Sequence, residues 1–375
     1  MSELDGRTSA FNGFVLSMFE RTTPFRQGGS KMRRVKAYFL FFLAFTVCGV
    51  VFSVAPAQAA DKPIEVRLAH MFPVGSPSHQ IMEAWAKKIA TDSNGRLTAR
   101  IFPVNTLVPA PELVDAVASG TADMSFGFRY APKGQPLGVT FPFILGAPDV
   151  ITATKVYDDL WKKFPKVMAD EWKDVKILWL TSSMFQALHT RKPVRSLDDM
   201  KGLQIRVPSP EMAMMMKDLG ATPVFMSTAD FVIGMEKKTV DGGTIQPQAV
   251  EDNKLAGNLK YMLDLSLGAP TPVFAIMNKD FYGKLPADLK AVIDKSCDWG
   301  KQATVQMWVD AWEEVKKYYK TEGVEIVTLP SQERAKVVSI VEKTRDKVGR
   351  ELDAKGIPGT EVVKYIRERV QQYAK

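Results

Sequence analysis

The sequence has few of the residues that most often carry chemistry. Its 375 residues include two cysteines and three histidines. It contains neither the HExxH motif of zinc proteases nor the GxSxG motif of serine hydrolases, and no metal-ligand spacing. Cys297, the one cysteine outside the N-terminal apolar run, has no partner for an internal disulfide. A secreted two-lobed hydrolase, the enzyme alternative, would need a nucleophile and a base, so we predict no catalytic residue, cofactor or metal site.

A concentrated basic surface is also missing. The formal net charge is +8, but residues 1–60 hold 7 of the 50 Lys and Arg against 3 of the 42 Asp and Glu. The remainder carries 43 basic and 39 acidic residues, mixed evenly along the chain and without a basic stripe interleaved with aromatics. We therefore expect no nucleic-acid partner.

One long apolar run occurs, close to the N-terminus. The basic stretch MRRVK begins at Met32, apolar residues fill 37–54, and the small residues APAQAA follow. This order is typical of a secretory signal peptide, predicted at 32–59 with cleavage after Ala59 or one residue later. An uncleaved anchor is the alternative, because about 18 apolar residues can just span a bilayer. We expect a periplasmic protein, with Met32 as its true start and 1–31 as a non-native extension.

Segments with strand and helix patterns alternate after residue 60. Ile81, Trp85 and Ile89 recur at helical spacing. Ser76 and Pro77, which precede them, are suited to cap and to open that helix. Strands are further expected at 64–70, 97–102, 122–128, 176–180, 203–207, 224–226 and 272–277, and helices at 111–119, 150–172 and 211–219. This alternation predicts an α/β fold in which mostly parallel sheets carry helices on both faces.

A long uninterrupted segment suggests how two domains are joined. Residues 286–322 contain no proline after the first position and a single glycine, Gly300. As a helix, about 37 residues would reach on the order of 55 Å, more than one small domain is wide. We therefore predict a bridging helix between two lobes. Lobe I is predicted to consist of 61–185 and 272–300, and lobe II of 186–271 and 301–375.

Arg206 is the strongest candidate for ligand binding. Side chains alternate along a strand, so Ile205 and Val207 take one face and Arg206 takes the other. Arg206 then lies at the carboxyl end of a strand, the edge where open α/β sheets bind ligands, and a helix follows at once. A guanidinium matches a carboxylate with two parallel hydrogen bonds. By spacing alone, however, a surface or interlobe salt bridge is the commoner role for such an arginine.

Several short motifs follow one another in a characteristic order. They are VRLAHMFPVGSPSH, NGRLTARIFPVNTL, SGTADM, KPVRSLDDMKGLQIRVP, LGATPVFM, KKTVDGG and MNKDFYGKLPADLKAVID. With them, nearly the whole mature chain resembles the DctP family of substrate-binding proteins from tripartite ATP-independent periplasmic (TRAP) transporters. The resemblance implies a two-lobed periplasmic binding protein fold that closes at a hinge. It also implies that Arg206 grips a carboxylate of the ligand.

The same resemblance implies partners. The receptor would deliver its solute to a membrane permease made of a small four-helix and a large multi-span subunit, driven by an ion gradient. Some relatives bind the ligand together with a cation, which this sequence leaves open. An ABC-type binding protein with a different permease, and a sensor subunit that presents its ligand to a membrane kinase, are the alternatives.

The sequence departs from the sialic-acid-type members at two positions. Where they carry a second arginine, this chain has Gln186, and where they have an asparagine after the VDG motif, it has Gln246. The lower positive charge disfavours a sugar acid or a long dicarboxylate and favours a monoanion with an apolar body. Asp241 and Gly242 are expected to shape a turn.

Further ligand contacts are predicted from residues that follow strands, or that lie in the loop after LGATP where the family often touches its ligand. Arg129 can equally be interpreted as a surface charge, and Phe72 can equally be interpreted as a core residue. The candidates are His70, Phe72, Arg129, Tyr130, Met226, Thr228 and Asp230.

The leader prediction is testable in a Gram-negative host. The protein purified from the periplasm should begin at Ala60 or Asp61, because signal peptidase cuts after small residues. Mass analysis of the intact protein and of its N-terminal peptide measures this. A mature chain that still begins before Met32 would contradict the predicted leader.

Overall fold

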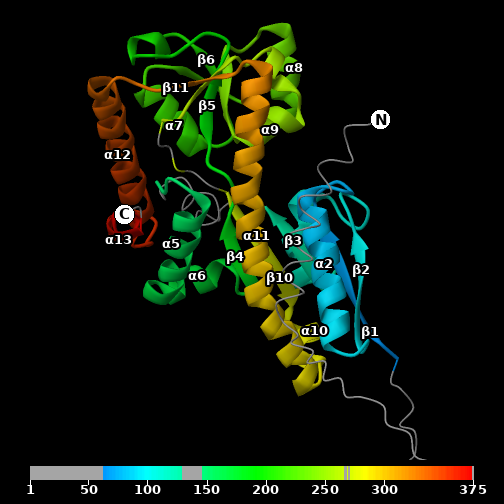
Figure 1. The fold of residues 1–375 in the computed structure, drawn as a ribbon. Helices are drawn as coiled ribbons and strands as arrows, with labels where there is room; N and C mark the ends of the chain where they lie inside the picture. Colours follow the sequence, from blue (N-terminus) through cyan, green and yellow to red (C-terminus); the bar gives the residue numbers. More distant parts are fainter. Residues whose placement is uncertain (1–61, 129–145, 266–267, 269–270, 374–375) are drawn as a thin grey trace, which may run out of the picture. The chain divides into compact units, whose positions relative to one another are not determined.

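The computed structural model describes residues 62–128, 146–265, 268 and 271–373. The predicted leader and extension, together with Arg129 and Tyr130, lie outside these residues. The described strands form two sheets surrounded by helices, in the orders β2-β1-β3-β10-β4 and β11-β9-β5-β8-β6-β7 (Figure 1). The predicted α/β class is confirmed.

The first sheet, here called sheet 1, has a parallel core and one opposed strand. β1 pairs in parallel with β2 and β3, whereas β10 lies antiparallel between β3 and β4. The predicted strand at 272–277 therefore returns to this sheet late in the chain. The strands of sheet 1 are β1 (Ile64–His70), β2 (Leu97–Phe102), β3 (Met124–Phe128), β4 (Val175–Ser182) and β10 (Pro272–Asn278).

The second sheet, sheet 2, repeats this plan. β6 is parallel to β7 and β8, β9 is parallel to β11, and β5 is antiparallel to both of its neighbours. Only residues 183–186, here called the crossing segment, separate β4 of sheet 1 from β5 of sheet 2. The strands of sheet 2 are β5 (Ala187–Thr190), β6 (Gln204–Val207), β7 (Thr222–Phe225), β8 (Gly242–Ile245), β9 (Tyr261–Leu263) and β11 (Glu325–Val327).

The helices begin and end where the local sequence dictates. Ser76 accepts a hydrogen bond from the backbone N–H of His79 (3.3 Å), and Pro77 opens the helix, as predicted. The α-helices are α2 (Pro77–Asp92), α3 (Leu113–Ala118), α5 (Val150–Lys163), α6 (Pro165–Glu171), α7 (Pro210–Asp218), α8 (Thr228–Lys237), α9 (Pro247–Asp252), α10 (Lys279–Lys284), α11 (Ala287–Glu322), α12 (Ser331–Asp353) and α13 (Gly359–Tyr373). The described residues also form short 3-10 helices at Ala110–Glu112, Asp198–Met200 and Leu255–Gly257.

Three local predictions were wrong. The expected helix at 150–172 is broken into α5 and α6, because Pro165 lacks a backbone N–H and disfavours a helical residue before it. Gly242 does not shape a turn but begins strand β8. Thr228 and Asp230 do not lie in a loop, because they form the first turn of α8.

Both faces of sheet 1 carry helices. Trp179 and Leu180 are adjacent in β4, so their side chains point to opposite faces. Leu180 packs in a buried cluster with Val117 of α3, whereas the Trp179 indole donates to Thr304 Oγ1 of α11 at 3.2 Å. The predicted covering of a mostly parallel sheet by helices is confirmed.

Helix α11 runs past both sheets as one 36-residue element (Figure 1), about 54 Å long at 1.5 Å per residue. Beside sheet 1 it is held by the Trp85 indole, which donates to Ser296 Oγ at 2.9 Å. Beside sheet 2 it is held by Tyr319, whose hydroxyl lies 2.6 Å from His189 Nε2 and 3.2 Å from the Pro247 carbonyl oxygen. The long lobe-spanning helix predicted from 286–322 is confirmed.

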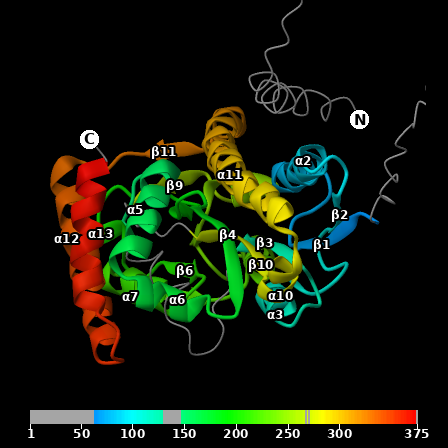
Figure 2. The same cartoon turned by 90° about the horizontal axis from the view of Figure 1, so that it is seen from below.

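Helices α12 and α13 pack side by side after β11 (Figure 2). Their backbones touch, because a Cβ on Gly359 would lie 2.2 Å from the Gly349 carbonyl oxygen. Tyr157 of α5 and Val341 of α12 belong to one buried cluster with Ile205 of β6. Among the described residues, no helix combines the length and apolar character needed to cross a membrane.

The contact between α11 and β4 depends on a missing side chain. A Cβ on Gly300 would lie 2.6 Å from Trp179 Cη2, and that ring is buried and hydrogen-bonded. We expect Gly300→Ala to lower the free energy of unfolding by roughly 1 to 2 kcal/mol, because overpacking outweighs the gain in helix propensity. Gly283→Ala, in α10 with open space around its Cα, is the matched control and should not destabilise the protein. Urea unfolding of both variants measures the difference, and equal midpoints would contradict the close packing.

Candidate functional site

Arg206 lies near the carboxyl end of β6, and its guanidinium is surrounded by neutral acceptors. Its Nε donates to the Met226 carbonyl oxygen (3.1 Å) and its Nη1 to the Thr244 carbonyl oxygen (2.9 Å). Its Nη2 donates to Thr228 Oγ1 at 3.4 Å. The Phe231 ring lies under it, with 5.7 Å from the guanidinium carbon to the ring centroid. The side chain is therefore fixed by contacts from β8, from the start of α8 and from the residues between β7 and α8.

The charge of Arg206 has no acidic partner among the described residues. Arg206 is 5 % exposed, and its burial lowers the pKa of the guanidinium to about 10. The group is still charged at neutral pH. Each terminal nitrogen carries two N–H groups and uses one of them in the bonds above, so each keeps one for another acceptor.

Two glycines in β8 create the room for this arrangement. A Cβ on Gly243 would lie 2.7 Å from Cζ of Phe231 and 3.1 Å from Cβ of Arg206. On the neighbouring residue, a Cβ on Gly242 would lie 2.2 Å from the His189 carbonyl oxygen of β5. The Gly-Gly pair therefore lets β8 approach β5 on one side and the arginine with its aromatic support on the other. Sequence reasoning read the first of these glycines as a turn residue and gave the second no role.

The start of α8 adds a second source of positive potential. Ser227 caps this helix by accepting the backbone N–H of Asp230 at 3.0 Å. The Asp230 carboxylate accepts the Ser227 hydroxyl at 2.7 Å and is exposed, so the pair forms a cap. Thr228 at the first position bonds to Arg206, which places the N-terminus of α8 beside the guanidinium. Met226 contributes its carbonyl oxygen, while its sulfur lies over Gly234.

Gln246 connects the end of β8 to the crossing segment. Its Nε2 donates to Ser183 Oγ at 2.8 Å. The backbone N–H of Thr271, just before β10, donates to the same oxygen at 3.0 Å, and the Ser183 backbone N–H donates to the Thr271 carbonyl oxygen. Gln186 ends the crossing segment with its Oε1 buried and without a hydrogen-bond partner. The two glutamines thus lie where the chain passes between the sheets.

His70 ends β1 as a buried, neutral group. Its Nδ1 accepts the backbone N–H of Phe72 (3.1 Å), so its Nε2 carries the proton and donates to His79 Nδ1 (2.9 Å). Burial, and then electrostatic repulsion that a protonated His70 would meet from the neighbouring His79 ring, lower the pKa of His70 to about 4. Phe72 lies beside it, half-buried, with 6.1 Å between the ring centroids. Within the described residues, no group of three or more His, Cys, Asp or Glu side chains is placed to hold a metal ion.

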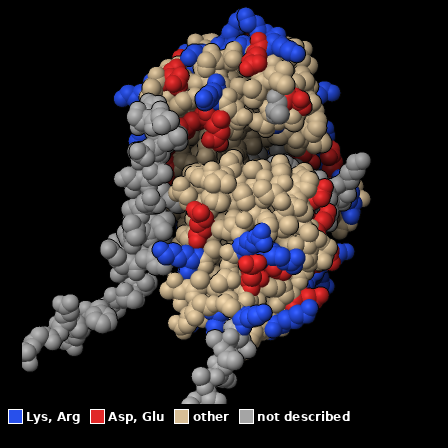
Figure 3. Space-filling view, turned by 90° about the vertical axis from the view of Figure 1, so that its right-hand side faces the viewer, with Lys and Arg blue, Asp and Glu red and all other residues tan. Residues whose placement is uncertain are grey.

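The molecular surface shows no field of one sign on the face drawn in Figure 3, where Lys and Arg alternate with Asp and Glu around a hollow across its middle. This agrees with the mixed charge seen in the sequence. The buried Arg206 is therefore a local feature that the net charge does not reveal.

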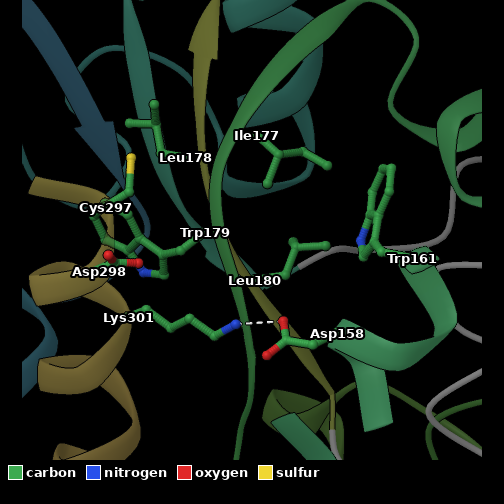
Figure 4. A pocket seen from close by; sticks show the side chains of 9 residues that line it. All are labelled: Asp158, Trp161, Ile177, Leu178, Trp179, Leu180, Cys297, Asp298 and Lys301. Carbon is green, nitrogen blue, oxygen red and sulfur yellow. Dashed lines mark hydrogen bonds and ion pairs between the residues drawn. The ribbon is translucent and has the colours of Figure 1, made fainter. Parts of the chain in front are cut away.

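A separate pocket of about 270 Å³ lies between α5, β4 and α11 (Figure 4). Asp158 of α5 and Lys301 of α11 point toward each other across it and form an ion pair. Cys297 also lines it, and burial raises the pKa of this thiol to about 12. The thiol is therefore protonated at neutral pH and is not an activated nucleophile. None of the predicted ligand contacts that the structure describes lines this pocket.

A family model matches most of the chain. The family described as "Bacterial extracellular solute-binding protein, family 7", DctP, matches residues 68–351. Among curated proteins, the 2,3-diketo-L-gulonate-binding periplasmic protein YiaO of Escherichia coli K12 is 27% identical over 244 residues. That alignment covers 63% of this chain and 72% of the relative.

Solved structures share the fold. A marine metagenome TRAP solute-binding protein specific for aromatic acid ligands, in complex with metahydroxyphenylacetate, has a TM-score of 0.72 at 23% identity, covering 83% of this chain and 100% of its own. A TRAP periplasmic solute-binding protein from Bordetella bronchiseptica with bound (R)- and (S)-mandelate has a TM-score of 0.68 at 21% identity, covering 83% and 99%. At such identities the likeness establishes the two-lobed architecture and nothing about this chain's ligand.

The lowered pKa of His70 makes a prediction for stability. Because the folded protein binds a proton at this site only near pH 4, whereas an unfolded chain binds it near pH 6.5, stability present above pH 6.5 is lost as the pH falls toward 4. His70→Gln cannot take up that proton, so it should lose less stability over this interval. Urea unfolding between pH 7 and pH 4 measures how the free energy of unfolding of wild type and of the variant changes with pH. Parallel curves for wild type and variant would contradict the assignment.

Proposed function

Because the chain belongs to the DctP family of bacterial extracellular solute-binding proteins, we propose that it is the receptor of a TRAP transporter for a small carboxylate. It would bind this solute in the periplasm and deliver it to the membrane permease, whose expected parts are a small four-helix and a large multi-span subunit. The family is a class of receptors and not of enzymes. The receptor reading therefore agrees with the scarcity of nucleophiles and bases in the sequence.

The observation that carries the proposal is the unpaired, buried charge of Arg206. Three neutral acceptors hold the guanidinium, and one N–H remains on each terminal nitrogen. A buried charge without a counter-charge is costly, so an anion that enters beside it gains strongly. A carboxylate fits because its two oxygens match N–H groups on neighbouring nitrogens. The start of α8 beside Arg206 favours the same ligand charge.

We further propose that the solute is a monoanion with an apolar body. Gln186 and Gln246 are neutral, and His70 is neutral at pH 7 because its pKa is lowered to about 4. Among the described candidates, Arg206 is thus the single fixed cation. Arg206 is the one described candidate that offers a charge to a carboxylate, and Arg129, the other proposed cation, lies outside the described residues. Two solved neighbours that share the fold hold metahydroxyphenylacetate and mandelate, which are monoanions, so this fold can accommodate a solute of the proposed class.

The remaining predicted contacts stay part of the proposal. His70 and Phe72 would line the site from sheet 1, and Met226 and Thr228 from the start of α8. Asp230, which caps α8, is proposed as an outer contact. Arg129 and Tyr130 follow β3 directly and are proposed to border the solute from that side.

We also propose that the two lobes close on the solute at a hinge. The crossing segment and Thr271, where the chain passes from one sheet to the other, are joined by paired backbone and side-chain bonds. This supports a hinge at those residues. The proposed boundaries remain 61–185 with 272–300 for lobe I, and 186–271 with 301–375 for lobe II.

Removing the guanidinium should weaken carboxylate binding strongly. Arg206→Ala leaves the bound anion buried without a partner, which typically costs on the order of 3 to 5 kcal/mol, or roughly two to three and a half decades in affinity. Arg206→Lys keeps the positive charge but loses the planar pair of donors that forms two parallel hydrogen bonds, so it should also bind weakly. Titration calorimetry with the best carboxylate from a thermal-shift screen measures the three dissociation constants.

Gln186→Ala is the matched control, since a neutral hydrogen bond contributes about 0.5 to 1.5 kcal/mol. It should lose far less affinity than either arginine variant. Circular dichroism checks that all variants are folded. If folded Arg206→Ala binds within threefold of wild type, Arg206 is structural and the carboxylate proposal fails.

A further inference from the structure

A row of aromatic rings runs along one face of sheet 1 toward its carboxyl edge. Phe126 and Phe128 are two residues apart in β3 and share a face. The Phe72 ring centroid lies 5.4 Å from each of theirs. Phe126 is fully buried, whereas Phe72 and Phe128 are partly exposed. The row therefore begins in the core and ends with two accessible rings at the edge where α/β sheets bind ligands.

Helix α11 supports this row from behind. The Trp308 ring lies 5.9 Å from the Phe128 ring at an angle of 35°, and Trp308 is 4 % exposed. One residue earlier, the Ser78 hydroxyl of α2 donates to Met307 Sδ at 3.5 Å, which joins this part of α11 to α2. The Phe128 ring is thus backed by a buried indole and flanked by Phe72 at an interplanar angle of 76°. Its orientation is set before any ligand arrives.

Further aromatic rings lie between sheet 1 and the crossing segment, which leads to sheet 2 with Arg206. Trp312, one helical turn after Trp308, packs edge-on against Phe185 with 5.1 Å between the ring centroids. Phe185 belongs to the crossing segment, next to Gln186 and two residues after Ser183, which bonds to Gln246. Aromatic rings thus extend from the edge of sheet 1 to the segment that meets the Arg206 side of sheet 2.

The chemistry of this surface selects a flat apolar group. Among the described residues, His70 beside Phe72 is buried and bonded to His79 and to the Phe72 backbone, so both of its ring nitrogens are already engaged. Aromatic rings pair best edge-to-face or offset at centroid distances of about 4.5 to 7 Å. Phe72 and Phe128 already stand edge-to-face, so a third ring completes the same arrangement.

From this placement we propose that the solute is an aromatic monocarboxylate whose ring packs against Phe72 and Phe128 while Arg206 binds its carboxylate. Phe128 is then a specificity-determining residue, and Trp308 is a positioning residue that holds the Phe128 ring. This inference rests on the proposed carboxylate receptor function and adds the class of the solute's body.

Matched pairs of acids test the ring requirement. Benzoate, phenylacetate and mandelate are compared by calorimetry with cyclohexanecarboxylate, cyclohexylacetate and hexahydromandelate, which keep the carboxylate and replace the flat ring by a puckered one. We expect at least one aromatic acid to bind, about tenfold tighter than its saturated partner, because only the flat ring pairs with Phe72 and Phe128. The measurement uses the wild-type mature chain, so it does not depend on any variant folding.

Variants then locate the effect. Phe128→Leu keeps an apolar side chain but loses the ring, so it should reduce the tenfold preference to about twofold or less while the saturated acid keeps its affinity. Phe102→Leu is the matched control, because Phe102 ends β2 and packs beside Ala69 against the buried cluster that contains Leu180 and Val117. It should leave the preference unchanged. If Phe128→Leu is unstable, Phe72→Leu tests the same preference for aromatic acids at the second ring.

The outcomes separate the two proposals. Saturated or linear acids that bind through Arg206 at least as tightly as aromatic ones would overturn the aromatic inference and leave the receptor proposal intact. If Phe128→Leu lowered the affinity for aromatic and for saturated acids by the same factor, the aromatic inference would also be overturned. If no monocarboxylate binds, the carboxylate proposal falls and takes this inference with it.

Discussion

A guanidinium that leaves water must be surrounded by acceptors, and this requirement shapes the centre of sheet 2. Arg206 is 5 % exposed, and its acceptors come from β8 and from the residues that lead into α8. β8 can supply its carbonyl only because Gly243 has no side chain to strike Phe231. The Gly-Gly pair of β8 and the start of α8 therefore both serve to accommodate one buried charge. The charge itself stays uncompensated by any acid in the described part of the chain, which a protein tolerates where an anion is to bind.

Much of the fold can be predicted from the sequence where the pattern is long. The strand at 64–70, the helix that Ser76 caps and the bridging helix at 286–322 carry enough periodic positions to be read directly. The four-residue strands β5 and β8 could not be predicted in this way, because so short a segment shows no clear alternation of side chains. In β8, moreover, the Gly-Gly pair resembles a turn. A single proline likewise divided a helix that the apolar pattern suggested was continuous.

The candidate site divides in the same way. Arg206 was accessible to sequence reasoning because its position at a strand end and the resemblance to a family agree. The Thr244 carbonyl that binds it lies 38 residues away, and no local pattern reveals such a contact. Phe128 and Trp308 were missed for the same reason, since their rings meet across 180 residues of chain. Apolar residues in a strand and in a long helix are ordinarily core, and only partial exposure at the sheet edge distinguishes Phe128.

The proposed contacts come from different sheets, and this bears on how binding would produce closure. A carboxylate held by Arg206 belongs to sheet 2, whereas a ring held by Phe72 and Phe128 belongs to sheet 1. A solute that has only one of these groups gains binding free energy from one sheet alone, and it therefore does not favour the closed arrangement over the open one. A solute with both gains the second contribution only when the sheets are apposed around it, and a ligand shifts a conformational equilibrium by its difference in affinity for the two states. Selectivity and closure would then arise from the same two contacts, with α11, bonded to β4 of sheet 1 through Thr304 and to β5 of sheet 2 through Tyr319, as the element along which the sheets stay connected.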